Sequence, residues 1–389
     1  MHIAPAELGG RLHRAEITLV VGTRPEAIKL APVAAALAAR GLHPNLVLTG
    51  QHAVLDPAAF GLAALPVTAL HCPGLPDPHA HVRAVGKALV PLLRDGCGLV
   101  IVQGDTSSAA GGALAARIAR VPLAHVEAGL RTHDPRLPWP EEQFRVGIDR
   151  RADLLFAPTA TNASNLSREK VSGAVHITGN SGIDALLRVT RDLPPARLHD
   201  RGLPRVLATF HRRESWGAEF DAIAAALRAI AGEGLAEVEV LLHPNRHLTD
   251  RARRLLGNHR HIRLRNPCDH ATMIAAMLDC TLILSDSGGV QEEAPALGIP
   301  LLVLRAKTER PEGLASGNMA LVGTDPARIV AAVRRILADP MALAAMCRPA
   351  FPYGDGAAAP RIAGAIEHFL AASIARPPPR AAVSGGNAG

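Results

Sequence analysis

The chain has 389 residues, of which 48% are hydrophobic and 20% charged, and its formal net charge is +7. A single hydrophobic core stops growing at about 250–300 residues, so this length predicts two globular domains rather than a fibrous or disordered chain. Most basic residues are arginines spread along the sequence and aromatic residues make up only 3%, which argues against a nucleic-acid partner because base stacking needs aromatic side chains.

The N-terminal stretch Met1 to Glu16 lacks the apolar segment of a signal peptide, and no later run of about 18 apolar residues predicts a membrane helix. The five cysteines are widely spaced and form no CxxC pair, so a disulfide framework is not expected. These features predict a cytoplasmic protein with reduced thiols and no membrane partner.

The first half of the chain alternates short apolar runs with longer helical patterns, which is the rhythm of βαβ units around a parallel sheet. Two of the helical stretches are Pro25–Arg40, whose proline suits a first helical turn, and Ser107–Arg120. The strands predicted in this half are Ile17–Val21, Asn45–Leu48, Leu99–Val102, Leu123–Val126, Leu154–Ala157 and Val175–Ile177.

A charged, proline-containing stretch from Arg191 to Pro204 interrupts this rhythm and predicts a linker between domains 1–190 and 205–375. The strands predicted after it are Arg205–Thr209, Val238–Leu242, Ile262–Leu264, Leu282–Leu284, Leu301–Leu304 and Ala320–Val322. Two such α/β halves enclose a cleft, and ligands gather beyond the carboxyl ends of the strands. The tail 376–389, rich in proline and glycine, is expected to be disordered.

The run Ser285-Asp286-Ser287-Gly288-Gly289 joins a predicted strand to the helical stretch Val290–Leu297. A helix N-terminus that follows a glycine pair presents backbone N–H groups and a positive dipole end, which suits a diphosphate. The alternative is a tight turn with Ser287 as N-cap. Glu292 and Glu293 could complement the helix dipole, and Glu293 could equally reach ribose hydroxyls.

The run Gly22-Thr23-Arg24-Pro25-Glu26-Ala27-Ile28-Lys29 also joins a strand to a helix. Arg24 and Lys29 stand near the start of that helix, where a guanidinium can fork onto phosphate oxygens and an ammonium supplies a compact charge. The alternative is a solvated helix face.

Three carboxylates follow neighbouring strands or open a helix: Asp105, Glu127 and Glu141. Crowded carboxylates raise one another's proton affinity, which helps one of them act as acid or base near neutral pH. The alternative is that they form structural salt bridges with Arg131 and Arg145.

His211, in the run His211-Arg212-Arg213-Glu214, follows a strand of the second half and is expected to contact a phosphate or leaving group, or to move a proton. No HExxH or Cys/His framework predicts a metal. Neither a GxxxxGK[ST] loop, a GxGxxG turn nor a GxSxG elbow is present, so nucleotide hydrolysis, nicotinamide binding and serine-esterase chemistry lose support.

Taken together, the motifs resemble those of the non-hydrolysing UDP-N-acetylglucosamine 2-epimerases, over nearly the whole chain. This resemblance implies a glycosyltransferase-B-like α/β fold with two Rossmann-like domains, and a last helix that returns to the first domain. The runs that carry it are Gly22 to Lys29, Gly104-Asp105-Thr106, His125 to Arg131, His211 to Glu214, Ser287 to Glu293, Thr308 to Glu312 and Tyr353-Gly354-Asp355-Gly356.

The resemblance further implies inversion at C2 of UDP-GlcNAc through elimination and re-addition of UDP, with no cofactor. It implies that Asp105, Glu127 and Glu141 handle protons at C2 and at the sugar hydroxyls, and that His211, the fourth residue of the catalytic set, holds the departing diphosphate. The residues expected to hold the diphosphate of the UDP-sugar are Arg24, Ser287, Gly288 and Gly289. The other residues expected to bind the UDP-sugar are Lys29, Arg131, Met273, Glu293 and Arg310.

Several positions depart from the family pattern: Cys268, His270 and Met273 stand where glutamine and aromatic residues usually flank the uracil. Phe144 follows the glutamate pair in place of asparagine, and Ala306 replaces an acidic residue.

Some members of the family are activated by UDP-GlcNAc at a second site. The residues of this chain that match it are Gln51, His52, Arg83 and His243, but Val54 replaces a polar residue, which predicts weakened or absent activation.

Three other functions share the diphosphate site: a hydrolysing epimerase, a glycosyltransferase with a UDP-sugar donor, and a non-catalytic nucleotide-sugar sensor. The carboxylate trio argues against the sensor. The resemblance also predicts a homodimer.

Overall fold

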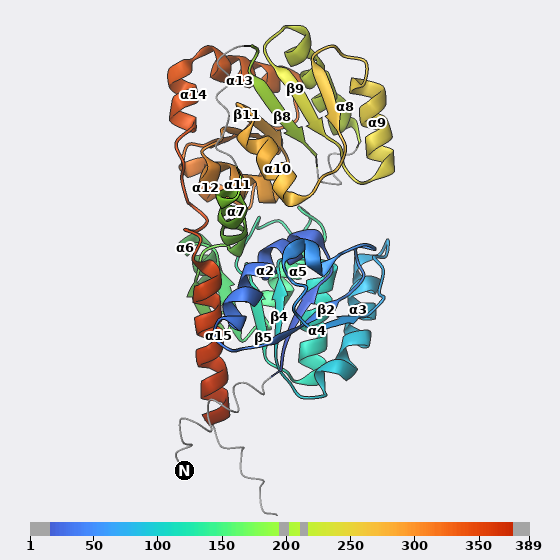
Figure 1. Cartoon of the computed structure of the whole chain (residues 1–389), viewed down its shortest axis with the longest axis vertical. Coiled ribbons are helices and arrows are strands. Elements are labelled where there is room, and N and C mark those ends of the chain that lie inside the picture. The colour runs from blue at the N-terminus through green and yellow to red at the C-terminus, as the bar shows by residue number, and fades with distance from the viewer. Residues whose placement is uncertain (1–15, 194–201, 211–216, 376–389) are drawn as a thin grey trace, which may run out of the picture.

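The computed structural model describes residues 16–193, 202–210 and 217–375, and it contains two parallel sheets surrounded by helices, one beyond the other along the molecule (Figure 1). The strands of the first sheet are β1 (Glu16–Val21), β2 (Pro44–Leu48), β3 (Val67–Ala69), β4 (Cys97–Gln103), β5 (Leu123–Val126), β6 (Leu154–Ala157) and β7 (Ala174–Ile177). The helices of this part are α2 (Arg24–Ala38), the 3-10 turn η1 (Pro57–Phe60), α3 (Pro78–Leu93), α4 (Ser107–Ala119), α5 (Glu141–Asp149), α6 (Ala160–Arg168) and α7 (Ser181–Arg191).

The second sheet has six strands, β8 (Arg205–Thr209), β9 (Glu237–Leu241), β10 (Ile262–Arg265), β11 (Leu282–Ser285), β12 (Leu301–Val303) and β13 (Met319–Leu321). The helices that follow in the chain are α8 (Ala218–Gly232), α9 (Arg246–Leu256), α10 (His270–Leu278), α11 (Gly288–Leu297), α12 (Pro311–Ala315), α13 (Pro326–Ala338), α14 (Pro340–Met346) and α15 (Ala358–Ala375).

Both sheets are doubly wound, which confirms the α/β class predicted from the sequence. Their strand orders are β3-β2-β1-β4-β5-β6-β7 and β10-β9-β8-β11-β12-β13, with parallel pairing throughout. The order therefore reverses between β1 and β4 in the first sheet and between β8 and β11 in the second. Such reversals open a crevice beyond the carboxyl ends of the strands, where ligands of α/β proteins bind.

All twelve strands predicted from the sequence are present, with ends that differ by at most two residues. Strand β3 was missed because its three residues are all exposed, so no apolar run marks it. Helix α11 begins at Gly288, two residues before the predicted start, and this places both glycines inside the first turn.

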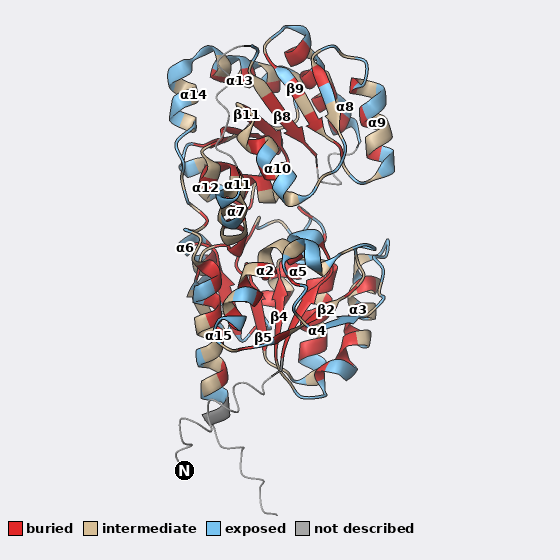
Figure 2. Cartoon of the chain, in the orientation of Figure 1, coloured by how far each residue is buried: buried red, intermediate tan, exposed pale blue. Residues whose placement is uncertain are grey.

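The central strands of both sheets are buried, as Figure 2 shows, because helices cover them on either face, whereas the edge strand β3 is exposed. The first sheet has one apolar layer on each side, and the layer against α2 also receives side chains of α15. Helix α15 is the last helix of the described residues, and it packs against α2 and α7 beside the first sheet (Figure 1). The linker residues 194–201 and the tail 376–389 lie outside the described residues.

Helix α7 connects the two halves of the molecule. It packs against α2 on one side and against α10 and α11 on the other. Ile183 and Leu186 of α7 share a small apolar cluster with Ile274, Ala296 and Tyr353 from the second half. Across the described part of the chain, no helix is both long and apolar enough to span a membrane.

Candidate active site

At the first reversal point, the buried side chain of Glu26 joins the loop after β1 to the loop after β4. Its Oε2 accepts hydrogen bonds from the Gly22 and Thr23 amides at 2.8 and 2.6 Å, and its Oε1 accepts one from the Thr106 hydroxyl at 2.5 Å. Burial raises the pKa of this carboxyl, although the hydrogen bonds from Thr106, Gly22 and Thr23 oppose the shift. Glu26 thus fixes the position of the loop that contains Arg24 relative to the loop that contains Asp105.

Lys29, one helical turn further along α2, contacts carboxylates of both domains. Its Nζ lies 2.8 Å from Oε2 of Glu127 at the end of β5 and 2.9 Å from Oε2 of Glu292 on α11. Only 12% of the Lys29 side chain is exposed. Burial lowers the pKa of Lys29, but the charges of Glu127 and Glu292 outweigh burial and raise it overall, so the ammonium stays charged between its two partners.

Glu127 stands in a strained turn that aims its carboxylate at the second domain. Its φ of 73° lies in the left-handed region, which costs a residue other than glycine about 1–3 kcal/mol. Besides Lys29, the carboxylate accepts hydrogen bonds from the Gln103 amide and from Nη2 of Arg310 at 3.1 Å. Burial, with the nearby charge of Glu292, raises the pKa of Glu127 despite Lys29 and Arg310, which favours proton uptake by this carboxylate.

Arg310, just before α12, is the corresponding centre in the second domain. Its Nε lies 2.7 Å from Glu292, its Nη1 contacts Glu309, and its Nη2 reaches Glu127. Burial raises the pKa of Glu292, but the charges of Arg310 and Lys29 outweigh burial and hold it below its ordinary value. Arg310 and Lys29 therefore bridge carboxylates across the domain boundary.

Gly288 leaves room for the guanidinium of Arg310 at the start of α11. A Cβ atom on Gly288 would lie 2.8 Å from Nη1. Among the described residues, a Cβ on Gly289 would meet only the Ser287 hydroxyl, at 3.9 Å. Ser287 is the N-cap residue, yet its side chain makes no capping hydrogen bond. The turn therefore lacks the capping serine that would give it a purely structural role. The amides of the first turn of α11 lie at the second reversal point.

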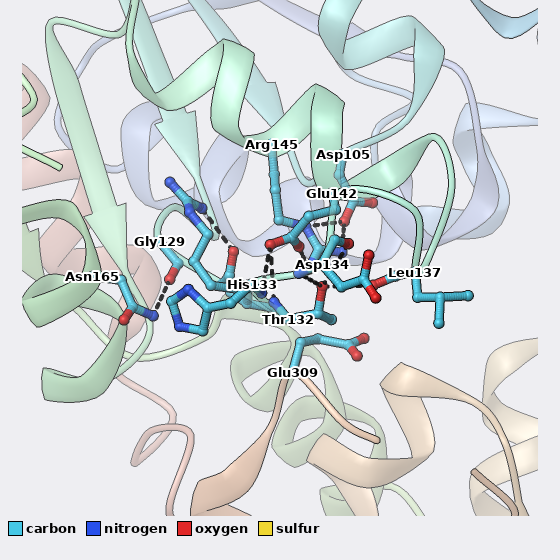
Figure 3. A network of polar contacts seen from close by, with 12 residues as sticks. Asp105, Gly129, Thr132, His133, Asp134, Leu137, Glu142, Arg145, Asn165 and Glu309 are labelled. Atoms are coloured by element: carbon cyan, nitrogen blue, oxygen red, sulfur yellow. Dashed lines mark hydrogen bonds and ion pairs between the residues drawn. The ribbon is translucent and has the colours of Figure 1, made fainter. Parts of the chain in front are cut away.

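A second polar network lies beside Glu127 in the first domain. Figure 3 shows Asp105, Glu142 and Arg145 drawn together, with Glu309 reaching toward them from the other domain. Arg145 donates from Nε to Asp105 at 2.9 Å and from Nη1 to Glu142 at 3.0 Å. Asp105 thus forms the salt bridge with Arg145 that is the structural alternative to a catalytic role. Glu141, the first residue of α5, is half-buried beside the pair.

Arg131 is predicted to bind substrate, but its guanidinium contacts structural partners. It lies 2.7 Å from Glu169 and 2.8 Å from Asp149, and it also donates to the Leu130 carbonyl. Asp149 in turn holds His125 of β5 at 2.6 Å. This cluster stabilises the turn after β5 that contains Glu127, because Asp149 also accepts a hydrogen bond from the Gly129 amide at 3.1 Å.

Two predicted ligands of the nucleotide lie together on neighbouring helices of the second domain. Glu293 contacts Nε2 of His270 at 2.8 Å, and Met273, one turn along α10 from His270, packs partly buried against the core under α11. Across the cleft, Arg24 is exposed at the start of α2. The pKa of Asp269 is lowered mainly by hydrogen bonds from Thr272, and the positive charge of Arg24 adds to this, so Arg24 faces the β10–α10 loop.

The four residues matched to a second site are spread over both domains. The amide oxygen of Gln51 accepts hydrogen bonds from Ser108 at the start of α4, and Nδ1 of His52 faces the Arg24 amide at 3.4 Å. Arg83 is exposed beside Asp77 at 3.5 Å. His243 lies after β9, where its ring accepts a hydrogen bond from the Asn245 amide.

His211, the fourth residue of the predicted catalytic set, lies outside the described residues. In the described ranges 16–193, 202–210 and 217–375, no group of three or more His, Cys, Asp or Glu side chains could hold a metal ion.

Two of the central residues, Glu292 and Glu309, are not among the site residues predicted from the sequence. Helical spacing contained the signal for Glu292, because positions four apart share a face and Gly288 and Glu292 are so related. Glu309 lies in an irregular loop before α12, where no periodicity shows which way a side chain points.

Comparison with known proteins identifies the family of this chain. A family model described as UDP-N-acetylglucosamine 2-epimerase matches residues 35–367. The UDP-N-acetylglucosamine 2-epimerase of Escherichia coli K12 is 39% identical over 380 residues, covering 91% of this chain and 98% of the relative. The crystal structure of the Neisseria meningitidis UDP-GlcNAc 2-epimerase bound to UDP-GlcNAc superposes with a TM-score of 0.84 at 32% identity, covering 90% of this chain and 99% of that one. The Staphylococcus aureus MnaA–UDP co-structure gives 0.83 at 35% identity, covering 92% and 97%.

Proposed function

This chain belongs to the UDP-N-acetylglucosamine 2-epimerase family, and from that premise we propose that it converts UDP-GlcNAc to UDP-ManNAc without releasing free sugar. One observation carries the proposal: charged side chains at the reversal points of both sheets contact each other directly. Arg310 meets Glu127, and Lys29 meets Glu292. A site assembled from two domains suits a substrate whose sugar and nucleotide are held by different domains.

In the proposed reaction, a carboxylate removes the proton from C2 of the sugar while the bond from C1 to UDP breaks. UDP leaves with the bonding electrons, and a glycal with a C1–C2 double bond remains. UDP then adds back at C1, and a proton is delivered to C2 on the opposite face. Because the C2 proton is weakly acidic, both a positioned carboxylate and a stabilised leaving group are required. We assign the proton transfers to Asp105, Glu127 and Glu141.

We assign the leaving diphosphate to the start of α11. The amides of the first helical turn lack partners within the helix and carry the positive end of its dipole, and the Ser287 hydroxyl is not used for capping. Arg24 approaches from the opposite domain, and His211 is proposed to add a further contact. The remaining proposed substrate ligands are Lys29, Met273, Gly288, Gly289, Glu293 and Arg310. Arg131 is left out because its guanidinium is already paired with Glu169 and Asp149.

The burial of the interdomain contact supports epimerisation rather than hydrolysis. Glu127, Glu292, Glu309 and Arg310 are each less than a tenth exposed. A closed site of this kind keeps water from the glycal and holds UDP close for re-addition. A hydrolysing enzyme would instead release free ManNAc and UDP.

The decisive experiment incubates the purified protein with UDP-GlcNAc in deuterated water and follows the products by NMR. We expect UDP-ManNAc with deuterium at C2. Free ManNAc would indicate hydrolysis, transfer that requires an added acceptor would indicate a glycosyltransferase, and binding without exchange would indicate a sensor.

Amide variants test the assignment of the carboxylates. Asp105→Asn, Glu127→Gln and Glu141→Gln are each expected to lower the exchange rate at C2 by at least about a hundredfold, the usual contribution of a positioned acid or base. Glu233→Gln is the matched control, because this exposed carboxylate pairs with Arg334 on the surface of the second domain. Equal rates of exchange at C2 in all four variants would show that these three carboxylates do not transfer the proton.

We also propose that activity does not depend on UDP-GlcNAc as an activator. The Gln51 amide oxygen is already bonded to the start of α4, and Val54 is 78% exposed where a polar residue would be needed. Starting from UDP-ManNAc, the rate should follow a hyperbola that added UDP-GlcNAc does not steepen. A sigmoidal curve would show that the second site still works.

Two predictions from the family resemblance and the sequence remain part of the proposal: a homodimer and a cytoplasmic location. Light scattering after size-exclusion chromatography should give twice the chain mass of 40.7 kDa. Cell fractionation should recover the protein with the cytosol.

A further inference from the structure

Tyr353 is the only tyrosine of the chain, and its buried hydroxyl contacts the backbone on both sides of a helix start. It lies in the segment between α14 and α15, where the chain passes from the second domain back to the first. Its Oη donates to the Arg310 carbonyl and accepts from the Gly313 amide, both at 2.8 Å. Only 3% of this residue is exposed.

These two hydrogen bonds replace the cap that α12 lacks. Arg310 is the N-cap residue of α12, and its side chain makes no capping hydrogen bond because the guanidinium points to Glu292 and Glu127. The next residue, Pro311, has no N–H to satisfy. The Gly313 amide is therefore the donor at the third helical position that an N-cap side chain would normally bond, and the phenol of Tyr353 takes that place.

The fit around the phenol is close. A Cβ atom on Gly313 would lie 2.8 Å from the Tyr353 hydroxyl and 2.6 Å from the sulfur of Met319, so glycine lets the ring approach the helix. Burial raises the pKa of Tyr353, and the hydroxyl keeps the proton that it donates to Arg310.

The backbone of Tyr353 is tied to the domain junction. Its carbonyl accepts a hydrogen bond from the Asn180 amide at 2.7 Å, and Asn180 caps α7, the helix that packs against both domains. The neighbouring glycines touch, since a Cβ on Gly179 would lie 3.1 Å from the Cα of Gly354. Tyr353 thus connects the place where the chain crosses between domains to the backbone of Arg310.

We propose that Tyr353 is a positioning residue that holds Arg310 in the orientation in which its guanidinium spans Glu292 and Glu127. This inference rests on the proposed function, because the effect of Tyr353 on Arg310 is measured as a change in epimerase activity. Without the phenol hydroxyl, the Arg310 carbonyl and the Gly313 amide lose their shared partner and the start of α12 can rotate. The contact of Nη2 with Glu127, at 3.1 Å the longer of the two, should be lost first.

The test is Tyr353→Phe, which keeps the ring and removes the hydroxyl. We expect kcat to fall by about tenfold, the effect of one well-made hydrogen bond, while the folded chain retains its circular dichroism. Thr18→Val is the matched control: it removes a buried hydroxyl, bonded to Cys97 at 3.3 Å, from the end of the first sheet far from the site, and kcat should not change. A Tyr353→Phe chain with the kcat of the parent would overturn the proposal.

A double-mutant cycle separates positioning from general stability. If Tyr353 acts through Arg310, then Tyr353→Phe should cost about tenfold in the parent but less than about twofold in an Arg310→Lys chain. Equal losses in both backgrounds would show that the tyrosine acts independently of Arg310, and the inference would fail.

A measurement without turnover distinguishes failure of this inference from failure of the proposed function. Because the chain has one tyrosine, 3-fluorotyrosine labelling gives a single ¹⁹F resonance. We expect Arg310→Lys to shift that resonance in the ligand-free protein and Thr18→Val to leave it in place. No shift with Arg310→Lys would refute the link between the two residues even if the chain proves to be an active epimerase.

Discussion

Replacement of Gly288 by alanine tests whether Arg310 is held as tightly as the structure indicates. The added Cβ would lie 2.8 Å from Nη1, 2.9 Å from Cζ and 3.1 Å from Nη2 of Arg310. A long side chain on a surface could move away at little cost. This guanidinium cannot, because Glu292, Glu309 and Glu127 hold it from three directions in a buried site.

The expected cost follows from the size of the clash. Relief to an ordinary contact requires the guanidinium to move by several tenths of an ångström, and overpacking of this kind destabilises a buried site by about 1–3 kcal/mol. In a domain of this size, each kcal/mol corresponds to about 2–4 °C in melting temperature. We therefore expect Gly288→Ala to melt about 2–12 °C below the parent.

Gly289→Ala is the internal control. Both glycines lie in the first turn of α11, so alanine restricts the unfolded chain equally at either position and stabilises by about 0.4–1 kcal/mol where it fits. Within the described part of the chain, a Cβ on Gly289 meets only one atom, at 3.9 Å. Thermal unfolding of the two ligand-free variants, followed by circular dichroism, isolates the contact with Arg310. Equal melting temperatures would refute the view that Arg310 is fixed by its three carboxylates.

Three further changes test the buried charges. Asp149→Asn should lower the free energy of unfolding in urea by about 3–5 kcal/mol at pH 7, because Arg131 and His125 lose a buried partner. Burial raises the pKa of Asp149, but the charges and hydrogen bonds of those two partners outweigh burial and hold the pKa below its ordinary value of 3.8. The difference in stability between the variant and the parent should therefore shrink as the pH falls below 3.8. Burial raises the pKa of Glu26, so the parent loses stability as this carboxyl gives up its proton above about pH 4.5. The melting temperature of Glu26→Gln, measured relative to the parent, should therefore rise progressively above that pH, and a difference in melting temperature that is independent of pH would contradict this. Lys29→Met removes a cation that lowers the pKa of both carboxylates it bridges, so the acidic limb of the pH–rate profile should move upward by about one unit.

The strands were predictable because a sheet covered by helices on both faces needs nearly continuous apolar runs. Leu154–Ala157, for example, is buried along its whole length, and its sequence alone marks it. Strand β3 shows the limit of this signal, since its exposed residues contain no apolar run to detect.

The site was predictable to the extent that chemistry follows strand ends. Lys29 and Arg310 are predicted to bind the substrate and Glu127 to transfer a proton, and the structure brings the three side chains together. Arg131 shows why position in a motif is not enough, because its guanidinium turns back toward Glu169 and Asp149 inside the first domain. The direction of a long side chain depends on partners that are distant in sequence.

The sequence by itself determined the alternation of strands and helices, the family, and the loops where charged residues would gather, because these depend on local pattern and on motif order. Only the tertiary structure decided which charges meet: Glu292 rather than Glu293 faces Lys29, and Tyr353 caps the helix that begins after Arg310. These pairings join residues up to 263 positions apart in the chain. Their geometry is set by how two domains pack, and no local pattern encodes it.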